Sequence, residues 1–209
     1  MARSTRLRIF LLFAVLGLVP ALAQQSRDQW QRPAEVMDAL HLGPGSKVAD
    51  VGAGEGYFTF HLAERVGPQG RVYAEDIDSG VVADLKAAAK QRGLGQVEVI
   101  QGTASDPRLP EAALDAVLIV NAYHEMDEHD AMLKGILRAL KPGGLLGIID
   151  KEAENGHPRS WYHSHHRIAE QVVKDEARAD GFDFAGSRPG FTRSGDGTPW
   201  YFLLFAKPR

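Results

Sequence analysis

The chain has no cysteine among its 209 residues. This absence excludes disulfide bonds, thiolate metal sites and a thiol nucleophile, so the apolar core alone has to hold the fold. Long runs of lysine or arginine are also missing, and the formal net charge is −3. A nucleic acid or an anionic membrane surface is therefore not expected as the main partner.

The sequence also lacks an apolar run of the roughly 20 residues that a membrane-spanning helix needs. The uncharged run at residues 9–22 is shorter and follows three arginines, and Ala21-Leu22-Ala23 has the small-x-small pattern of a signal-peptidase site. We expect a signal peptide over residues 1–23, cleaved after Ala23, and a periplasmic or secreted protein without stable membrane insertion. The alternative is an uncleaved N-terminal anchor. Cleavage would leave 186 residues with a net charge of −6, enough chain for one domain.

Two periodicities alternate along the rest of the chain, which predicts strands interleaved with helices. Strand patterns occur at 48–51, 71–76, 96–101, 114–121, 145–150, 182–187 and 200–208, and helix patterns at 33–40, 57–66, 81–91, 128–140 and 166–179. Parallel strands joined by helical crossovers form an α/β fold. We expect a three-layer α-β-α sandwich over residues 47–209, preceded by a polar segment and short helix at 24–46. Its seven-stranded, mostly parallel sheet should end in an antiparallel C-terminal edge hairpin.

A glycine turn, "DVGAGEGYF", follows the first strand of this domain. Gly52, Gly54 and Gly56 allow a tight turn and a close approach to a ligand, and the following helix offers free N–H groups. A dinucleotide fingerprint would need a third glycine where Tyr57 stands, and a P-loop would need G-K-[ST]. The acid inside the strand, Asp50, disfavours a pyrophosphate. The turn therefore predicts a site for a ligand that carries a cationic or ammonium group.

The second strand ends in "YAEDID", which places Asp76 20 residues after Gly56. An acid at this position can accept hydrogen bonds from both hydroxyls of a ribose, as adenosine-containing ligands require. The other interpretation of Asp76 is a solvated acid before a helix. Asp78 is the residue that we expect to cap that helix.

Four stretches in this order and spacing resemble the class I S-adenosylmethionine-dependent methyltransferases: "VADVGAGEGYFT", "VYAEDID", "LDAVLIVNAYHEM" and "LKPGGLLGIID". The similarity covers residues 48–150 and continues more loosely to the end of the chain. The resemblance implies a Rossmann-like fold, S-adenosyl-L-methionine as cofactor and methyl transfer as the activity. The cofactor-binding residues that it implies are Asp50, Gly52, Gly54, Gly56, Tyr57, Asp76, Ile77 and Asn121.

In this resemblance the glycine turn contacts the methionine part of the cofactor, Asp50 holds its ammonium group, and Asp76 binds the ribose with Ile77 against the adenine. Asn121 could fix the methionine end by hydrogen bonds. The chain departs from the family pattern after the third strand, where Gly-Thr-Ala (residues 102–104) replaces the common Gly-Asp-Ala. Thr103, Ala104 and neighbouring backbone groups, or Asp106 two residues further on, are left to contact the adenine. We favour Asp106 slightly, although Asp-Pro also starts ordinary turns.

The fourth strand leads into "NAYHEMDEHD", where the methyl donor should meet its acceptor. Tyr123 and His124 are the expected catalytic residues, because a histidine with a pKa near 6.5 suits removal of a proton from the acceptor. The alternative for His124 is a structural role before a helix. The segment is not the Asn-Pro-Pro-Tyr motif of several nucleic-acid and protein methyltransferases. A small-molecule or lipid-like acceptor is therefore expected, and no nucleic acid.

A histidine-rich stretch follows the fifth strand within the long loop expected at residues 151–165. The spacing of its histidines matches no closed ligand set, so we expect solvated loop residues and no metal. Trp161, Tyr162 and His163 could instead line an acceptor pocket. An exported domain also raises a question of supply, since S-adenosylmethionine is made in the cytoplasm. A non-catalytic exported binding module with the same fold is the alternative function.

Overall fold

The computed structural model describes residues 27–209, so the expected signal peptide lies outside the described residues and stays a prediction. The chain divides into two compact units, of which the second, Ala34–Arg209, contains the sheet. In the first unit, residues 27–31 are helical. None of the helices from residue 27 onward is both long and apolar enough to cross a membrane.

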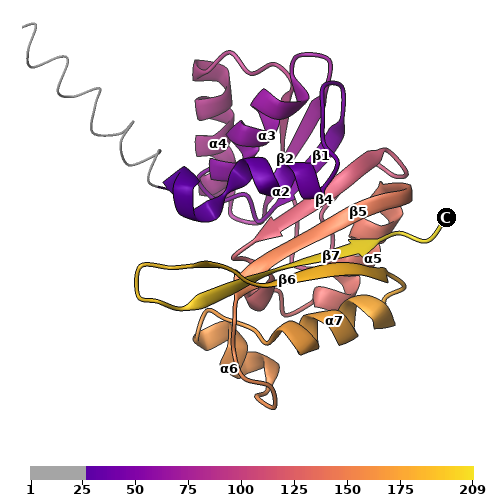
Figure 1. Ribbon diagram of the computed structural model, residues 1–209. Helices are drawn as coiled ribbons and strands as arrows, with labels where there is room; N and C mark the ends of the chain where they lie inside the picture. The colour runs from indigo at the N-terminus through magenta and orange to yellow at the C-terminus, as the bar shows by residue number, and fades with distance from the viewer. Residues whose placement is uncertain (1–26) are drawn as a thin grey trace, which may run out of the picture. The chain divides into compact units, whose positions relative to one another are not determined.

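A sheet of seven strands, in the order β3-β2-β1-β4-β5-β7-β6, organises the second unit (Figure 1). Strands β1 to β5 run parallel to one another, whereas β7 runs antiparallel to both β5 and β6. The expected mostly parallel sheet with an antiparallel C-terminal hairpin is confirmed. The strands are β1 (Lys47–Val51), β2 (Arg71–Asp76), β3 (Val97–Gln101), β4 (Leu114–Val120), β5 (Leu140–Lys151), β6 (Asp183–Arg193) and β7 (Pro199–Ala206).

Helices cover both faces of this sheet, with α2, α3 and α4 on one side and α5 and α7 on the other (Figure 1). The loop expected at residues 151–165 in fact contains a helix, α6, and the last long helix begins four residues later than predicted. Both differences arise where a short element lacks enough turns to show a period. The helices are α2 (Pro33–Ala39), α3 (Tyr57–Val66), α4 (Ser79–Gln91), the 3₁₀ helix η1 (Tyr123–Glu125), α5 (His129–Ala139), α6 (Arg159–Ser164) and α7 (Glu170–Ala179).

The central strand β4 is buried on both faces, which explains its unbroken apolar run. Val117 and Ile119 belong to the core cluster that includes residues of α5 and α7. Leu118 points to the opposite face, where it approaches Gly147 of the neighbouring strand. A strand covered by helices on both sides gains from an apolar side chain at every position, so alternation is lost. This arrangement leaves the carboxyl ends of β1, β4 and β5 next to one another.

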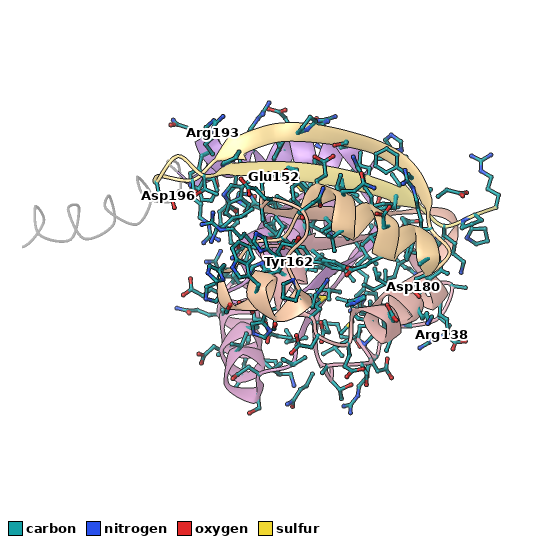
Figure 2. All side chains as sticks on the ribbon, turned by 90° about the horizontal axis from the view of Figure 1, so that it is seen from below. Arg138, Glu152, Tyr162, Asp180, Arg193 and Asp196 are labelled. Carbon is teal, nitrogen blue, oxygen red and sulfur yellow. The ribbon has the colours of Figure 1, made fainter. Side chains whose placement is uncertain are left out.

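The hairpin between β6 and β7 is closed by a short polar turn at residues 194–198. Asp196 lies at the tip of this hairpin (Figure 2), where it accepts hydrogen bonds from the Ser194 hydroxyl at 2.5 Å and the Thr198 N–H at 3.0 Å. These hydrogen bonds, the one from Ser194 first, lower the pKa of Asp196 to about 2. The turn is shorter than the sequence suggested, because β6 continues to Arg193.

We expect Asp78→Ala to lower the free energy of unfolding by about 1 kcal/mol, the usual value for loss of an N-cap. The Asp78 carboxylate accepts hydrogen bonds from the N–H groups of Gly80 at 2.7 Å and Val81 at 3.0 Å at the start of α4, as the sequence predicted. Urea denaturation measures the change. Asp84→Ala, an exposed change within the same helix, is the control. Equal midpoints for the two variants would contradict the capping role.

Candidate active site

The glycine turn after β1 closes against the end of β4. A Cβ atom built on Gly52 would lie 2.6 Å from the Ala122 Cβ, and the φ of Gly52 is 70°. Only glycine fits both constraints. A Cβ on Gly54 would meet nothing within 4 Å, so the backbone is open on that side. Gly56 has φ 81° and serves as the N-cap position of α3.

Asp50 and Asp76 lie on either side of this turn, as expected from the ends of β1 and β2. Asp50 is 3% exposed, and its carboxylate accepts a hydrogen bond of 2.6 Å from the Thr59 hydroxyl. Burial raises the pKa of Asp50 to about 6. The two carboxylate oxygens of Asp76 accept hydrogen bonds, both of 3.0 Å, from the N–H groups of Gly54 and Asp78. Asp76 thereby ties the glycine turn to the end of β2.

A third acid, Glu75, was not singled out from the sequence. It is 1% exposed, and burial raises its pKa to about 8, with further increases from the charges of Asp76, Asp50 and Asp106. Its Oε1 atom has no hydrogen-bond partner among the described residues and lies 1.9 Å from where a Cβ on Gly102 would stand. The sequence signal for Glu75 was a charged residue inside a buried strand. Four acids near one turn make the region favourable for a cation.

The turn after β3 holds Thr103, Ala104 and Asp106, but their side chains are differently engaged. The Thr103 N–H donates to the Asp106 backbone carbonyl at 2.9 Å, and the Asp106 carboxylate accepts from the Arg108 N–H at 2.9 Å. Asp106 therefore has the turn-forming role considered for it, and its contact with an adenine stays a prediction. Ile77, directly after Asp76, is 57% exposed, which is unusual for a large apolar side chain and leaves it free to contact a flat ring.

The segment after β4 brings His124 against Asp150 at the end of β5. Asn121 begins this segment with φ 55° and donates its N–H to the Ile149 carbonyl at 2.8 Å. His124 is completely buried, with Nδ1 2.8 Å from Asp150 Oδ1 and its backbone N–H donating to Oδ2 at 3.2 Å. Because a carboxylate only accepts, Nδ1 carries the hydrogen and Nε2 presents a lone pair. Asp150 was missed, although an acid that ends the apolar run "LLGIID" was a usable signal.

Tyr123 and Tyr57, the other expected site residues, are both buried. The Tyr123 hydroxyl donates to Glu176 Oε2 at 2.8 Å, and burial raises its pKa well above 10. That hydroxyl faces α7 rather than the glycine turn, so the geometry favours His124 over Tyr123 as the residue that handles a proton. Tyr57 opens α3 with its ring edge-on to Phe58 at a centroid distance of 5.1 Å.

Arg159 fastens α6 to the 3₁₀ helix that carries His124. Its guanidinium donates to both oxygens of Glu176, at 2.9 and 2.7 Å, and to the backbone carbonyls of Tyr123 at 2.7 Å and Met126 at 2.8 Å. Arg159 and Glu176 are mostly buried. This clamp links α6 and α7 to η1, the 3₁₀ helix that carries the histidine.

The aromatic residues of α6 have different surroundings. Trp161 stacks between His157 and His165, with centroid distances of 3.7 and 4.1 Å. Tyr162 is 1% exposed and donates its hydroxyl to the Glu154 carbonyl at 3.0 Å, so it belongs to the core beside α6 (Figure 2). The Nδ1 atom of His163 lies 3.2 Å from Oδ1 of Asp127. The segment thus lies next to η1, and its expected part in an acceptor pocket stays a prediction.

Comparison with known proteins agrees with this geometry. Residues 48–144 match a family model described as "Methyltransferase domain". Over 122 residues the chain is 32% identical to the demethylmenaquinone methyltransferase of Geobacillus stearothermophilus, covering 58% of this chain and 51% of that one. It is 35% identical over 113 residues to the nocamycin O-methyltransferase of Saccharothrix syringae, covering 54% and 40%. The matched part of the chain thus spans about half the length of these curated relatives, or less.

A crystal structure of a SAM dependent methyltransferase from Aquifex aeolicus has the same fold, with a TM-score of 0.73 and 25% sequence identity. The match covers 87% of this chain and 92% of that one. The sheet order and the glycine turn therefore define a Rossmann-like methyltransferase fold. The family model over residues 48–144, the curated relatives and this solved structure together support the class I S-adenosylmethionine-dependent methyltransferase family, as the motifs suggested.

Glu75→Gln should remove part of the pH dependence of stability. Because the folded pKa of Glu75 is raised from 4.5 to about 8, its proton stabilises the folded state fully below about pH 4.5 and progressively less up to about pH 8. Between pH 5 and 8 the wild type should lose up to about 1.4 kcal/mol per pH unit from this group, a loss that the neutral glutamine cannot show. Urea unfolding at several pH values measures both curves. Glu98→Gln, exposed on β3, should follow the wild type; a parallel curve for Glu75→Gln would refute the assignment.

Arg159→Ala should destabilise the fold by about 2 kcal/mol, since hydrogen bonds to charged groups contribute about 1.5–3 kcal/mol. The variant leaves Glu176 and two backbone carbonyls without their guanidinium partner. Thermal unfolding measures the effect. Arg167→Ala is the matched control, because Arg167 donates one hydrogen bond of 3.3 Å, to the His165 carbonyl. Similar melting temperatures for the two variants would show that the clamp is unimportant.

Proposed function

We propose that this protein transfers a methyl group from S-adenosylmethionine to a hydroxyl group of a small-molecule or lipid-like acceptor. The observation that carries the proposal is the group of buried acids around a glycine turn that is open on one side. The cofactor supplies a methyl group on a positively charged sulfonium and also carries an ammonium group. The cost of ionising Asp50 and Glu75 in a buried site falls when a cation binds beside them.

The residues around the glycine turn can bind the ammonium group, the ribose and the adenine of the cofactor. The Asp50 carboxylate, which accepts one hydrogen bond from Thr59, would accept others from the ammonium group. Each carboxylate oxygen of Asp76 accepts one backbone hydrogen bond, which leaves one lone pair on each oxygen for the two ribose hydroxyls. The exposed side chain of Ile77 follows directly, next to where an adenine would lie. A dinucleotide would instead bring its pyrophosphate against the carboxylates of Asp50 and Asp76.

His124 is the residue proposed to activate the acceptor. An enzyme that transfers a methyl group mainly supplies proximity and orientation, and a base is needed only when the acceptor starts protonated. Asp150 accepts a hydrogen bond from the imidazole Nδ1–H, which leaves the Nε2 lone pair available to take a proton. The relatives named for demethylmenaquinone and as a nocamycin O-methyltransferase support a small organic acceptor.

Export of the protein is part of the proposal, supported by the basic, apolar and small-x-small pattern over residues 1–23. An exported domain has to use S-adenosylmethionine that leaves the cytoplasm, or else remain anchored on the cytoplasmic side. Fractionation of cells that produce the full chain separates these cases. A protein that binds the cofactor but turns over no acceptor would instead be a binding module.

Calorimetry of the purified full chain tests the cofactor site. We expect binding of S-adenosylmethionine and S-adenosylhomocysteine but not of NAD, and at least about 10-fold weaker binding after Asp76→Ala, because two charge-assisted hydrogen bonds are lost. Asp84→Ala, which removes an exposed acid of α4, should bind as the wild type does. Binding of NAD alone, or full affinity in Asp76→Ala, would overturn the proposal. A thermal melt of each variant shows that it is folded.

A further inference from the structure

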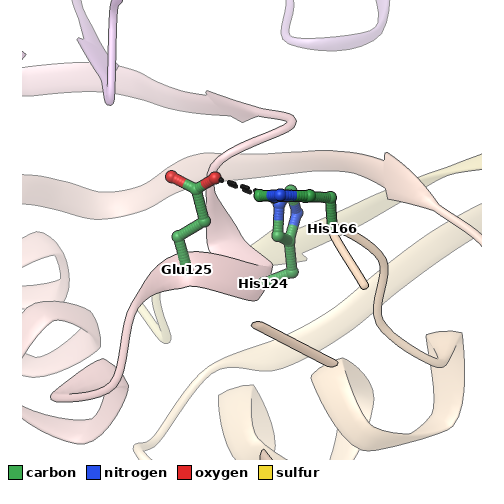
Figure 3. A group of neighbouring side chains, drawn as sticks. All are labelled: His124, Glu125 and His166. Carbon is green, nitrogen blue, oxygen red and sulfur yellow. Dashed lines mark hydrogen bonds and ion pairs between the residues drawn. The ribbon is translucent and has the colours of Figure 1, made fainter. Parts of the chain in front are cut away.

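Three side chains from distant parts of the sequence converge at the end of β4. His124 and Glu125 project from η1, and His166 reaches them from the segment before α7 (Figure 3). One nitrogen of each histidine and one oxygen of Glu125 all lie within 4.8 Å of one another. The histidine spacing had led us to expect no metal. It could not reveal this contact, because His166 lies 41 residues after Glu125.

The distances between these atoms suit a metal ion. Bonds of about 2.0–2.1 Å in a tetrahedral arrangement place neighbouring ligand atoms about 3.3–3.4 Å apart. His124 Nε2 lies 3.5 Å from Glu125 Oε1, and His166 Nδ1 lies 3.3 Å from the same oxygen. Two edges of the triangle therefore already have the required length. The histidine rings meet edge to face at a centroid distance of 5.7 Å, so both nitrogens can turn toward a common point.

The buried nitrogen of His124 is the second observation that points to a ligand. His124 is completely buried, yet its Nε2 has no hydrogen-bond partner among the described residues. An imidazole nitrogen left in this state costs free energy unless a proton donor or a metal ion approaches it. Its other nitrogen is held by Asp150, as metal-bound histidines are usually held by a carboxylate that fixes the tautomer.

The remaining two ligands leave a route to solvent. The side chains of Glu125 and His166 are 51% and 64% exposed, so an ion can enter from outside and keep at least one position open. Two imidazoles and one carboxylate are the ligand set of catalytic zinc sites and of related first-row metal centres. Mg²⁺ prefers oxygen ligands and should bind poorly here.

A second acidic and histidine cluster is less suitable. His129, Asp130 and Asp180 also come within 4.8 Å of one another. However, Lys134 already places its ammonium group 3.3 Å from Asp180, so a cationic partner is present. Within residues 27–209, Glu125 forms ion pairs with His124 and His166 and with no lysine or arginine.

We propose that His124, Glu125 and His166 form a site for a divalent first-row transition metal, such as Zn²⁺, with Asp150 as a positioning residue. The role of the metal rests on the proposed function: it would bind the acceptor hydroxyl and lower its pKa, so that the proton leaves to solvent instead of to Nε2. Binding of the metal itself is independent of methyl transfer.

Metal binding is tested on the purified full chain, stripped with a chelator and titrated with Zn²⁺ in competition with a chromophoric chelator. The wild type should bind one equivalent, and His166→Ala and Glu125→Gln should each bind at least about 10-fold more weakly. Co²⁺ gives a second readout, since its visible absorption bands should shift in His166→Ala as one nitrogen ligand is lost. His124→Ala removes a buried side chain, so the two exposed positions carry the test.

His165→Ala is the matched control, because it removes the adjacent exposed histidine, which stacks on Trp161 and is outside the cluster. This variant should retain the Zn²⁺ affinity of the wild type. Equal Zn²⁺ binding by wild type and His166→Ala, or an equal loss in His165→Ala, would overturn the metal site and leave His124 and Asp150 as a simple proton-handling pair.

Calorimetry with S-adenosylmethionine in the presence of the chelator separates the two proposals. If His166→Ala binds S-adenosylmethionine normally but loses Zn²⁺ binding, the result supports both the cofactor site and the separate metal site. If the wild type binds Zn²⁺ but no S-adenosylmethionine, the proposed function fails while the metal site stands. If the wild type binds S-adenosylmethionine but no Zn²⁺, the metal site is refuted and the proposed function stands.

Discussion

Carboxylates lie buried where the parallel strands end, and a buried charge is tolerated only when hydrogen bonds, protonation or a counter-charge offset its lost hydration. Each acid meets this constraint differently. Asp50 takes the Thr59 hydroxyl, Glu75 keeps its proton, and Asp150 receives the N–H groups of His124. The glycine turn, the 3₁₀ helix and the Arg159 clamp are arranged around these acids. The acids at the carboxyl ends of the parallel strands thereby favour the binding of positively charged ligands.

The edge of the sheet formed by these strand ends has two halves, which meet where Gly52 touches Ala122. On the side of β1 and β2, backbone groups and acids line the site proposed for the cofactor, a nucleoside that carries a charged amino acid. On the side of β4 and β5, the buried His124 is held in one orientation by Asp150. Because Gly52 has no side chain, the glycine turn packs directly against Ala122. A shift of the turn after β4 would therefore also displace the glycine turn. The fold alone does not fix a reaction, but this contact brings the proposed sites of the methyl donor and its acceptor next to one another.

Much of the fold could be predicted because buried parallel strands and their crossover helices leave strong periodic patterns. The C-terminal hairpin and the cap at Asp78 were also predictable, since each depends on local residue types. The helix α6 was missed because its six residues make fewer than two turns and are anchored by Arg159 from a distance. In the candidate site, the residues next to a motif could be named from the sequence, and their roles stay predictions. Asp150, Glu75 and His166 depend on contacts between separate strands and segments, which spacing along one sequence does not encode.

The position of β7 has a consequence for how the domain is completed. This strand lies between β5 and β6, and Asp150 pairs with Tyr201 in its register. During synthesis, β5 therefore remains an open sheet edge until nearly the whole chain has been made. The strand that carries Asp150 gains its second neighbour last, and the edge that awaits it can pair with other chains. Folding of the acceptor half is thus delayed until the C-terminal residues arrive, whereas β1, β2 and β3 can assemble earlier.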